Sequence, residues 1–177
     1  PPRSTLFPYT TLFRSVAFAP DDQVRWDATA VLASMVQWSL VPDDLMLPTR
    51  DILITLLARD SDRNVRLETA RGLGFFSYDK QALDALVAAV ADPDFGVVYQ
   101  AEQSLIRLTG QTFQADPDAW VKWRQATADP FLKAGQVPDS MKEQNLSWLG
   151  RRNRSIRRAM IAWQGEAKIQ DNDSGKR

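Results

Sequence analysis

The chain has 177 residues, with 22 basic and 22 acidic side chains and neither cysteine nor histidine. The lack of cysteine excludes disulfides, thiolate catalysis and cysteine-ligated zinc, and the lack of histidine excludes Ser–His–Asp and Cys–His catalytic sites. The composition is otherwise typical of a soluble globular domain. The missing Cys and His lead us to expect no cofactor, no metal and no independent catalysis. We favour a cytoplasmic protein, the alternative being one whose signal peptide has been lost.

The charges are unevenly distributed along the chain. Residues 16–141 carry 11 Lys and Arg against 18 Asp and Glu, whereas residues 142–177 carry 9 against 4. An acidic body is therefore followed by a basic tail. The longest uncharged stretch, 28–42, is shorter than the roughly 18 apolar residues of a membrane helix, and we interpret it as a buried helix.

The N-terminal segment has an unusual sequence. Residues 5–15 read TLFPYTTLFRS, which resembles the in-frame translation of a common sequencing-library adapter. We therefore interpret residues 1–15 as an added segment, begin the fold at Val16, and expect natural sequence to be missing upstream. The alternative is a natural β-hairpin rich in Thr and Phe.

Three windows of the sequence superpose without gaps. Each has an Asp three residues before a Val, a small residue four after that Val, and a Leu eight after it. Offsets of four and eight place side chains on one face of a helix, and the Asp is suited to an N-cap. The three sets, in the order Asp, Val, small residue, Leu, are Asp21, Val24, Ala28 and Leu32; Asp62, Val65, Thr69 and Leu73; and Asp94, Val97, Ala101 and Leu105.

The spacing between the windows suggests helical hairpins. The three Val residues are separated by 41 and then by 32 residues, periods that are typical of α-solenoids. We attribute the longer period to an extended loop over residues 42–48. Apolar runs lie at 52–58 and 82–90, before the second and third windows, and Gly72 and Gly74 predict a close helix approach or a helix end.

The pattern D-x-x-V-R-x-x-A-x-x-x-L resembles the second helix of HEAT repeats, over roughly residues 20–128. The resemblance implies an all-α, right-handed superhelix, with the repeat domain at 16–128. It also implies stacked Asp–Arg pairs between repeats, although Val98 replaces the expected Arg in the third. Stacking is needed because one hairpin cannot bury its own apolar face.

The end of the repeat domain has its own signature. The helix before Gly110 is predicted to end with that glycine in the left-handed conformation, and Asp116 with Pro117 to start another helix. The string L-T-G-x-x-F-x-x-D-P-x-x-W-x-x-W resembles the closing segment of small HEAT-repeat proteins. We expect its three aromatic residues to cover the end of the core, the alternative being an aromatic binding pocket. They are Phe113, Trp120 and Trp123.

The C-terminal part is predicted as a linker at 129–140, a basic amphipathic helix at 141–166 and a disordered tail at 167–177. The helix could dock on the solenoid, bind nucleic-acid phosphates, or lie on an anionic membrane surface. Its candidate anion-binding residues are Arg151, Arg152, Arg154, Arg157 and Arg158.

The resemblance implies a non-catalytic protein-interaction scaffold whose second helices line a concave face. Positions three and six after each Val would then contact a protein partner, of unstated identity. The candidate residues are Asp27, Glu68, Arg71, Gln100 and Gln103, with Ala30 completing the second row. The alternatives are nucleic-acid or membrane binding through the basic helix, and a role as an enzyme subunit or an accessory protein resembling bilin-chromophore lyases. The oligomeric state is not indicated.

Overall fold

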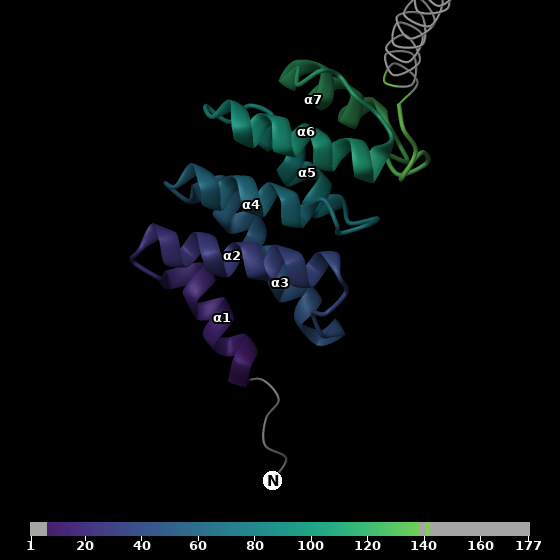
Figure 1. Cartoon of the computed structure of the whole chain (residues 1–177). Helices are drawn as coiled ribbons and strands as arrows, with labels where there is room; N and C mark the ends of the chain where they lie inside the picture. The colour runs from purple at the N-terminus through teal and green to yellow at the C-terminus, as the bar shows by residue number, and fades with distance from the viewer. Residues whose placement is uncertain (1–6, 139–140, 142–177) are drawn as a thin grey trace, which may run out of the picture. The chain divides into compact units, whose positions relative to one another are not determined.

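The computed structural model describes residues 7–138 and residue 141, and every regular element in them is an α-helix (Figure 1). This confirms the all-α prediction. Contacts divide the chain into two units, residues 1–137 and 138–177, and all of the labelled helices belong to the first. They are α1 (Phe7–Phe18), α2 (Asp22–Gln37), α3 (Asp43–Arg59), α4 (Arg63–Leu73), α5 (Lys80–Ala89), α6 (Phe95–Thr109) and α7 (Pro117–Ala126).

The helices form stacked hairpins in two layers. Helices α2, α4 and α6 pack side by side in one layer, and α3 and α5 pack behind them in the other (Figure 1). Each helix contacts the other helix of its hairpin and its neighbours in the stack. Each added repeat therefore buries more apolar surface. The arrangement is that of an α-solenoid, as the repeat spacing predicted.

The repeat register holds in the core. The small residue and the Leu of each window are buried in all three helices of the α2–α4–α6 layer, and Val65 and Val97 are fully buried. Side chains at offsets of zero, four and eight therefore point away from solvent in α4 and α6, as an apolar helical stripe requires.

The aligned register implies that Val24 is buried like Val65 and Val97. This expectation was wrong, because Val24 is 45% exposed. In α4 the corresponding side of the helix packs against the preceding hairpin, because a Cβ placed on Gly72 would lie 3.0 Å from the Cβ of Ala33 in α2. Val31 occupies the position of Gly72 and is 52% exposed. Among the described residues, no earlier helix of that layer covers this flank of α2.

The predicted loop over residues 42–48 was also wrong. Helix α3 begins at Asp43 and includes Pro48, and it has 17 residues where α5 has 10. Pro48 lacks an N–H and so loses a helical hydrogen bond, but buried Leu53 and Leu57 later in the helix anchor it to the core. The longer first period comes from longer helices rather than from a loop.

Aspartates cap the helices of the stack. The four predicted N-caps are confirmed, since each carboxylate accepts hydrogen bonds from N–H groups in the first turn of its helix. Asp79 caps α5 in the same way, and the repeat register missed it because it lies outside the three windows. The confirmed caps are Asp21, Asp62, Asp94 and Asp116.

Helix α1 runs across the expected domain boundary. It spans Phe7–Phe18 and contains Val16, which is fully buried. The β-hairpin alternative is therefore wrong for these residues. The origin of the segment, including its resemblance to a translated adapter, stays a prediction.

The segment expected as a linker is described as far as residue 138 and folds back onto the solenoid. Phe131 is 8% exposed, and the N–H of Gly135 donates a hydrogen bond of 3.0 Å to the carbonyl of Arg107 at the end of α6. The predicted basic helix after Met141 and the tail at 167–177 lie outside the described residues, as do the five candidate anion-binding arginines between 151 and 158.

Candidate interaction surface

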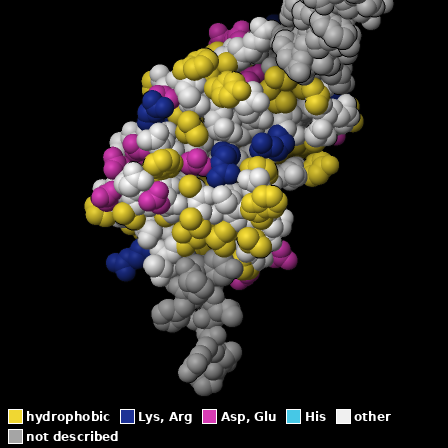
Figure 2. All heavy atoms as spheres, in the orientation of Figure 1, with side chains coloured by type: hydrophobic (Ala, Val, Ile, Leu, Met, Phe, Trp, Pro, Cys, Tyr) yellow, Lys and Arg dark blue, Asp and Glu magenta, His cyan; other side chains and the backbone are white. Residues whose placement is uncertain are grey.

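One face of the α2–α4–α6 layer carries the side chains that the repeat register directs away from the core. We call it the layer face, and define it by the positions three, six and ten residues after each register Val. Figure 2 shows acidic side chains gathered at one edge of this side of the molecule and basic ones near its middle. The residues at the three positions are Asp27, Ala30, Ser34, Glu68, Arg71, Phe75, Gln100, Gln103 and Arg107.

The predicted partner-binding residues all lie on the layer face and outside the core. Asp27 is exposed and accepts a hydrogen bond of 3.0 Å from Gln23, while the others are half-buried. The register therefore places them together on one surface, and their role in partner binding stays a prediction. The half-buried residues are Ala30, Glu68, Arg71, Gln100 and Gln103.

Arg71 links two helices of the layer. Its Nε donates a hydrogen bond of 2.7 Å to Glu68, its Nη1 donates one of 3.1 Å to Gln37, and its Nη2 donates one of 3.3 Å to the carbonyl of Ala30. These bonds fix the guanidinium between α4 and α2. Arg71 is therefore a structural contact as well as a surface residue.

Arg107 lies beside it with a different set of contacts. Its guanidinium sits over the ring of Phe75, 4.2 Å from the ring centroid, in a cation–π arrangement. Gly74 makes room for it, since a Cβ there would lie 3.0 Å from the Arg107 guanidinium and closer still to Ser104. Arg107 lies ten residues after Val97 and was therefore not among the predicted contact residues, which lie three and six residues after each Val.

Ion pairs between arginine and aspartate link the first turns of α2 and α4 to the turn of the next hairpin. Arg25 pairs with Asp60 at 2.9 Å, and Arg66 pairs with Asp92 at 2.8 Å, so each arginine reaches the carboxylate of the next hairpin turn. These are the Asp–Arg pairs that the family resemblance implied. Val98 stands at the third position, and within the described residues the series ends there.

Asp60 is held as a carboxylate. Burial acts to raise its pKa, but hydrogen bonds from the Arg25 guanidinium and the Asp62 N–H, together with the positive charges of Arg25 and Arg66, outweigh burial and lower it. The carboxylate is thus ionised at neutral pH and links two hairpins.

The C-terminal end of the stack is closed by an aromatic cluster around a buried carboxylate. Glu102 is 5% exposed, and it accepts hydrogen bonds from the Thr112 hydroxyl at 2.5 Å, the Phe113 N–H at 3.2 Å and the Trp120 indole N–H. The ring of Trp120 packs edge-on against Phe113 and Trp123, with centroids 4.9 and 5.4 Å away. Trp120 is fully buried, so the cluster covers the core, as predicted, and its indole is not open to a ligand.

The described residues contain no group of three or more His, Cys, Asp or Glu side chains that could hold a metal ion. None of the helices in the described part is both long and apolar enough to span a bilayer.

The two-layer stack, the repeated register and the linked turns define an α-solenoid repeat protein with one continuous layer face. The HEAT-repeat family profile matches residues 11–106 and again 50–128, which together cover more than half of the chain. The chain belongs to the HEAT-repeat family. HEAT repeats are generally protein-interaction scaffolds and typically non-catalytic. No curated protein and no solved structure matches the chain.

Proposed function

We propose that this chain is a non-catalytic scaffold that binds a partner protein through the layer face. The observation that carries the proposal is the register itself. It repeats along α2, α4 and α6 and brings nine side chains of these repeats to one surface, while the core and the Asp–Arg pairs are formed by other positions.

The layer face is also preorganised for binding. Its helices are fixed from below by buried leucines and along one edge by the ion pairs of Arg25 and Arg66. A rigid platform loses little conformational entropy when it binds. Polar groups such as Gln103, which has no side-chain hydrogen bond within the described residues, remain able to bond to a partner.

The opposite face, formed by α3 and α5, also carries polar side chains, among them Asp51, Gln81 and Asp84. Between α3 and α5 lies a shallow groove of about 340 Å³, and its walls are mostly small or apolar side chains such as Ile54, Ala85 and Ala88. Specific recognition generally needs a few well-placed polar groups among apolar ones. Both faces have such groups, and we favour the layer face because its positions recur with the repeat register.

Site-specific photo-cross-linking in cells that naturally express the protein tests the proposal. A photoreactive amino acid at Gln103 of the full chain should give a discrete protein adduct, and the same group at the exposed Ala88 of α5 should not. Adducts formed from Ala88 but not from Gln103 would contradict the assignment of the binding surface to the layer face.

A further inference from the structure

Arg107 is one of three arginines in the described part of the chain that form no ion pair with a carboxylate there. Six arginines lie within 4.0 Å of an Asp or Glu: Arg25, Arg50, Arg63, Arg66, Arg71 and Arg124. Within the described residues no such pair is formed by Arg14, Arg59 or Arg107. Of these three, Arg107 lies on the layer face and against an aromatic ring.

Arg107 is exposed to solvent, although neighbouring residues partly cover its guanidinium. Partial burial, and then the positive charge of nearby Arg71, hold the pKa of Arg107 below its ordinary value. An anion placed beside the guanidinium would relieve both effects, because it would replace lost hydration and offset the repulsion from Arg71.

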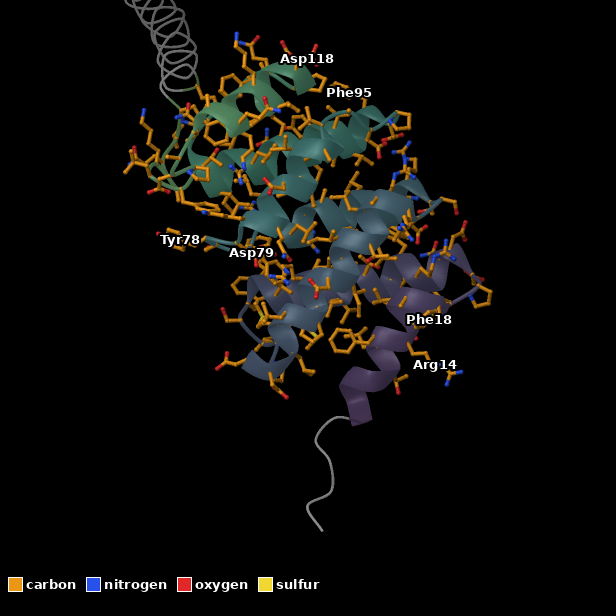
Figure 3. All side chains as sticks on the ribbon, turned by 180° about the vertical axis from the view of Figure 1, so that it is seen from behind. Arg14, Phe18, Tyr78, Asp79, Phe95 and Asp118 are labelled. Carbon is orange, nitrogen blue, oxygen red and sulfur yellow. The ribbon has the colours of Figure 1, made fainter. Side chains whose placement is uncertain are left out.

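A cavity of about 250 Å³ opens next to Arg107, with walls that are partly apolar. Tyr78 on its rim has a backbone φ of 62°, in the left-handed region that bulky residues rarely adopt, and its side chain is 73% exposed. Figure 3 shows Tyr78 projecting outward from the turn just before Asp79. The lining residues are Ser77, Tyr78, Arg107, Leu108, Ala134 and Gly135.

We propose that Arg107 and this cavity receive an acidic side chain of the partner protein, so that the docking segment carries an Asp or Glu beside an apolar residue. The inference rests on the proposed scaffold function. A guanidinium suits a carboxylate because it can donate two parallel hydrogen bonds to it, and the cavity has room for a side chain of the partner.

The charge of the whole body favours a single carboxylate over a polyanion. Residues 16–141 carry 11 basic against 18 acidic side chains, so an extended nucleic acid would be repelled along most of the surface. A protein segment with one acidic side chain would meet a positive site locally and avoid that repulsion.

Selection of random peptides displayed on phage against the immobilised full chain tests the proposal. The wild-type chain should enrich peptides that contain Asp or Glu next to an apolar residue. Arg107→Gln should weaken binding of a selected peptide about ten- to a hundredfold, the usual worth of a hydrogen bond to a charged group. Arg107→Glu should shift the enrichment toward Lys and Arg.

Two further variants complete the design. Arg59→Gln removes an exposed arginine of α3 that is unpaired within the described residues, and it should leave binding unchanged. Arg107→Lys keeps the positive charge but loses the planar guanidinium, so it should cause an intermediate loss of peptide binding. Circular dichroism melting curves show whether each variant folds, and Arg107→Lys still tests the proposal if Arg107→Gln folds poorly.

Enriched peptides without acidic residues, or acidic peptides bound equally by wild type, Arg107→Gln and Arg107→Lys, would overturn the inference. The scaffold function would survive that result if cross-linking from Gln103 still captured a partner. Failure of cross-linking at Gln103, with acidic peptides still dependent on Arg107, would instead count against the scaffold function alone.

Discussion

Glu102 is the residue on which the C-terminal end of the solenoid depends most. Its carboxylate is buried and forms no ion pair within the described residues, but three donors from the loop and α7 converge on it. A buried charge is tolerated when hydrogen bonds replace its hydration, and removing it leaves those donors unsatisfied.

Replacing Glu102 by Ala should therefore lower the free energy of unfolding by about 3 kcal/mol, the upper range for hydrogen bonds to a charged group. Glu102→Gln should cost less, because the amide oxygen still accepts hydrogen bonds. Urea denaturation measures both. Gln125→Ala at an exposed position of α7 serves as the control, and an equal loss there would show that the carboxylate has no special role.

Thr29 provides a prediction of the opposite sign. Its side chain is fully buried and its hydroxyl has no hydrogen-bond partner in the described part of the chain. Thr29→Val should raise the free energy of unfolding by about 1 kcal/mol, since it removes an unsatisfied polar group without changing shape. The matched control is Thr69→Val, because the Thr69 hydroxyl donates to the carbonyl of Val65 at 2.7 Å. Equal effects of the two substitutions would contradict the explanation.

At the scale of the element, the turn that joins α3 to α4 makes stability depend on pH. The pKa of Asp60 is lower in the folded chain than in the unfolded one, where it is about 3.9. The stabilisation from Asp60 is therefore complete above the unfolded pKa and is lost as the pH falls through the folded pKa.

The free energy of unfolding of the wild type should fall below about pH 4 more steeply than that of Asp60→Asn, which lacks the titrating group. Chemical denaturation at a series of acidic pH values measures the two slopes. Asp51→Asn is a suitable control because the side chain of Asp51 is 61% exposed. Parallel curves for wild type and Asp60→Asn would mean that this ion pair does not couple folding to protons.

The end of α6 gives a test of backbone geometry. Gly110 has a φ of 67° and closes the helix, and a Cβ there would collide with the backbone of Lys133. Gly135 has a φ of 74°, but a Cβ there would meet nothing within 4 Å. Both glycines are in the left-handed conformation, but only at Gly110 would a Cβ also collide with a neighbouring segment.

Gly135→Ala should lower the free energy of unfolding by about 1 kcal/mol, the cost of the left-handed conformation for a residue with a Cβ. Gly110→Ala should lower it by clearly more, because the Lys133 segment must also move. Thermal melts of both variants provide the comparison. If Gly110→Ala proved no worse than Gly135→Ala, the close contact with Lys133 would not exist in solution.

The helices of the stack were predictable because their signals are local. An Asp cap and apolar offsets of four and eight depend only on residues within one helix, and they hold from Asp62 to Leu105. The exposure of Val24 was not predictable in this way, since it depends on whether another helix covers its flank. Pro48 gave a loop signal that the buried side chains of α3 overrode.

At the scale of the whole molecule, the surface was predictable in part. The register placed Glu68 and Gln103 on the layer face, but the roles of Arg107 and Glu102 depend on contacts between segments far apart in the chain. The partners of Arg107 and Glu102 are decided by packing between segments, whereas the ion pairs of Arg25 and Arg66 were implied by the repeat pattern. The basic helix predicted beyond residue 141 lies outside the described residues, and its binding roles remain predictions.

The most direct test of the central claim is an NMR titration of the full chain with the partner that Gln103 captures. We expect the largest chemical-shift changes at Glu68, Gln103 and Arg107 on the layer face, with Thr55 and Ala88 on the opposite layer unchanged. Shifts concentrated at Thr55 and Ala88, with the layer face unaffected, would show that the partner binds the other side of the solenoid.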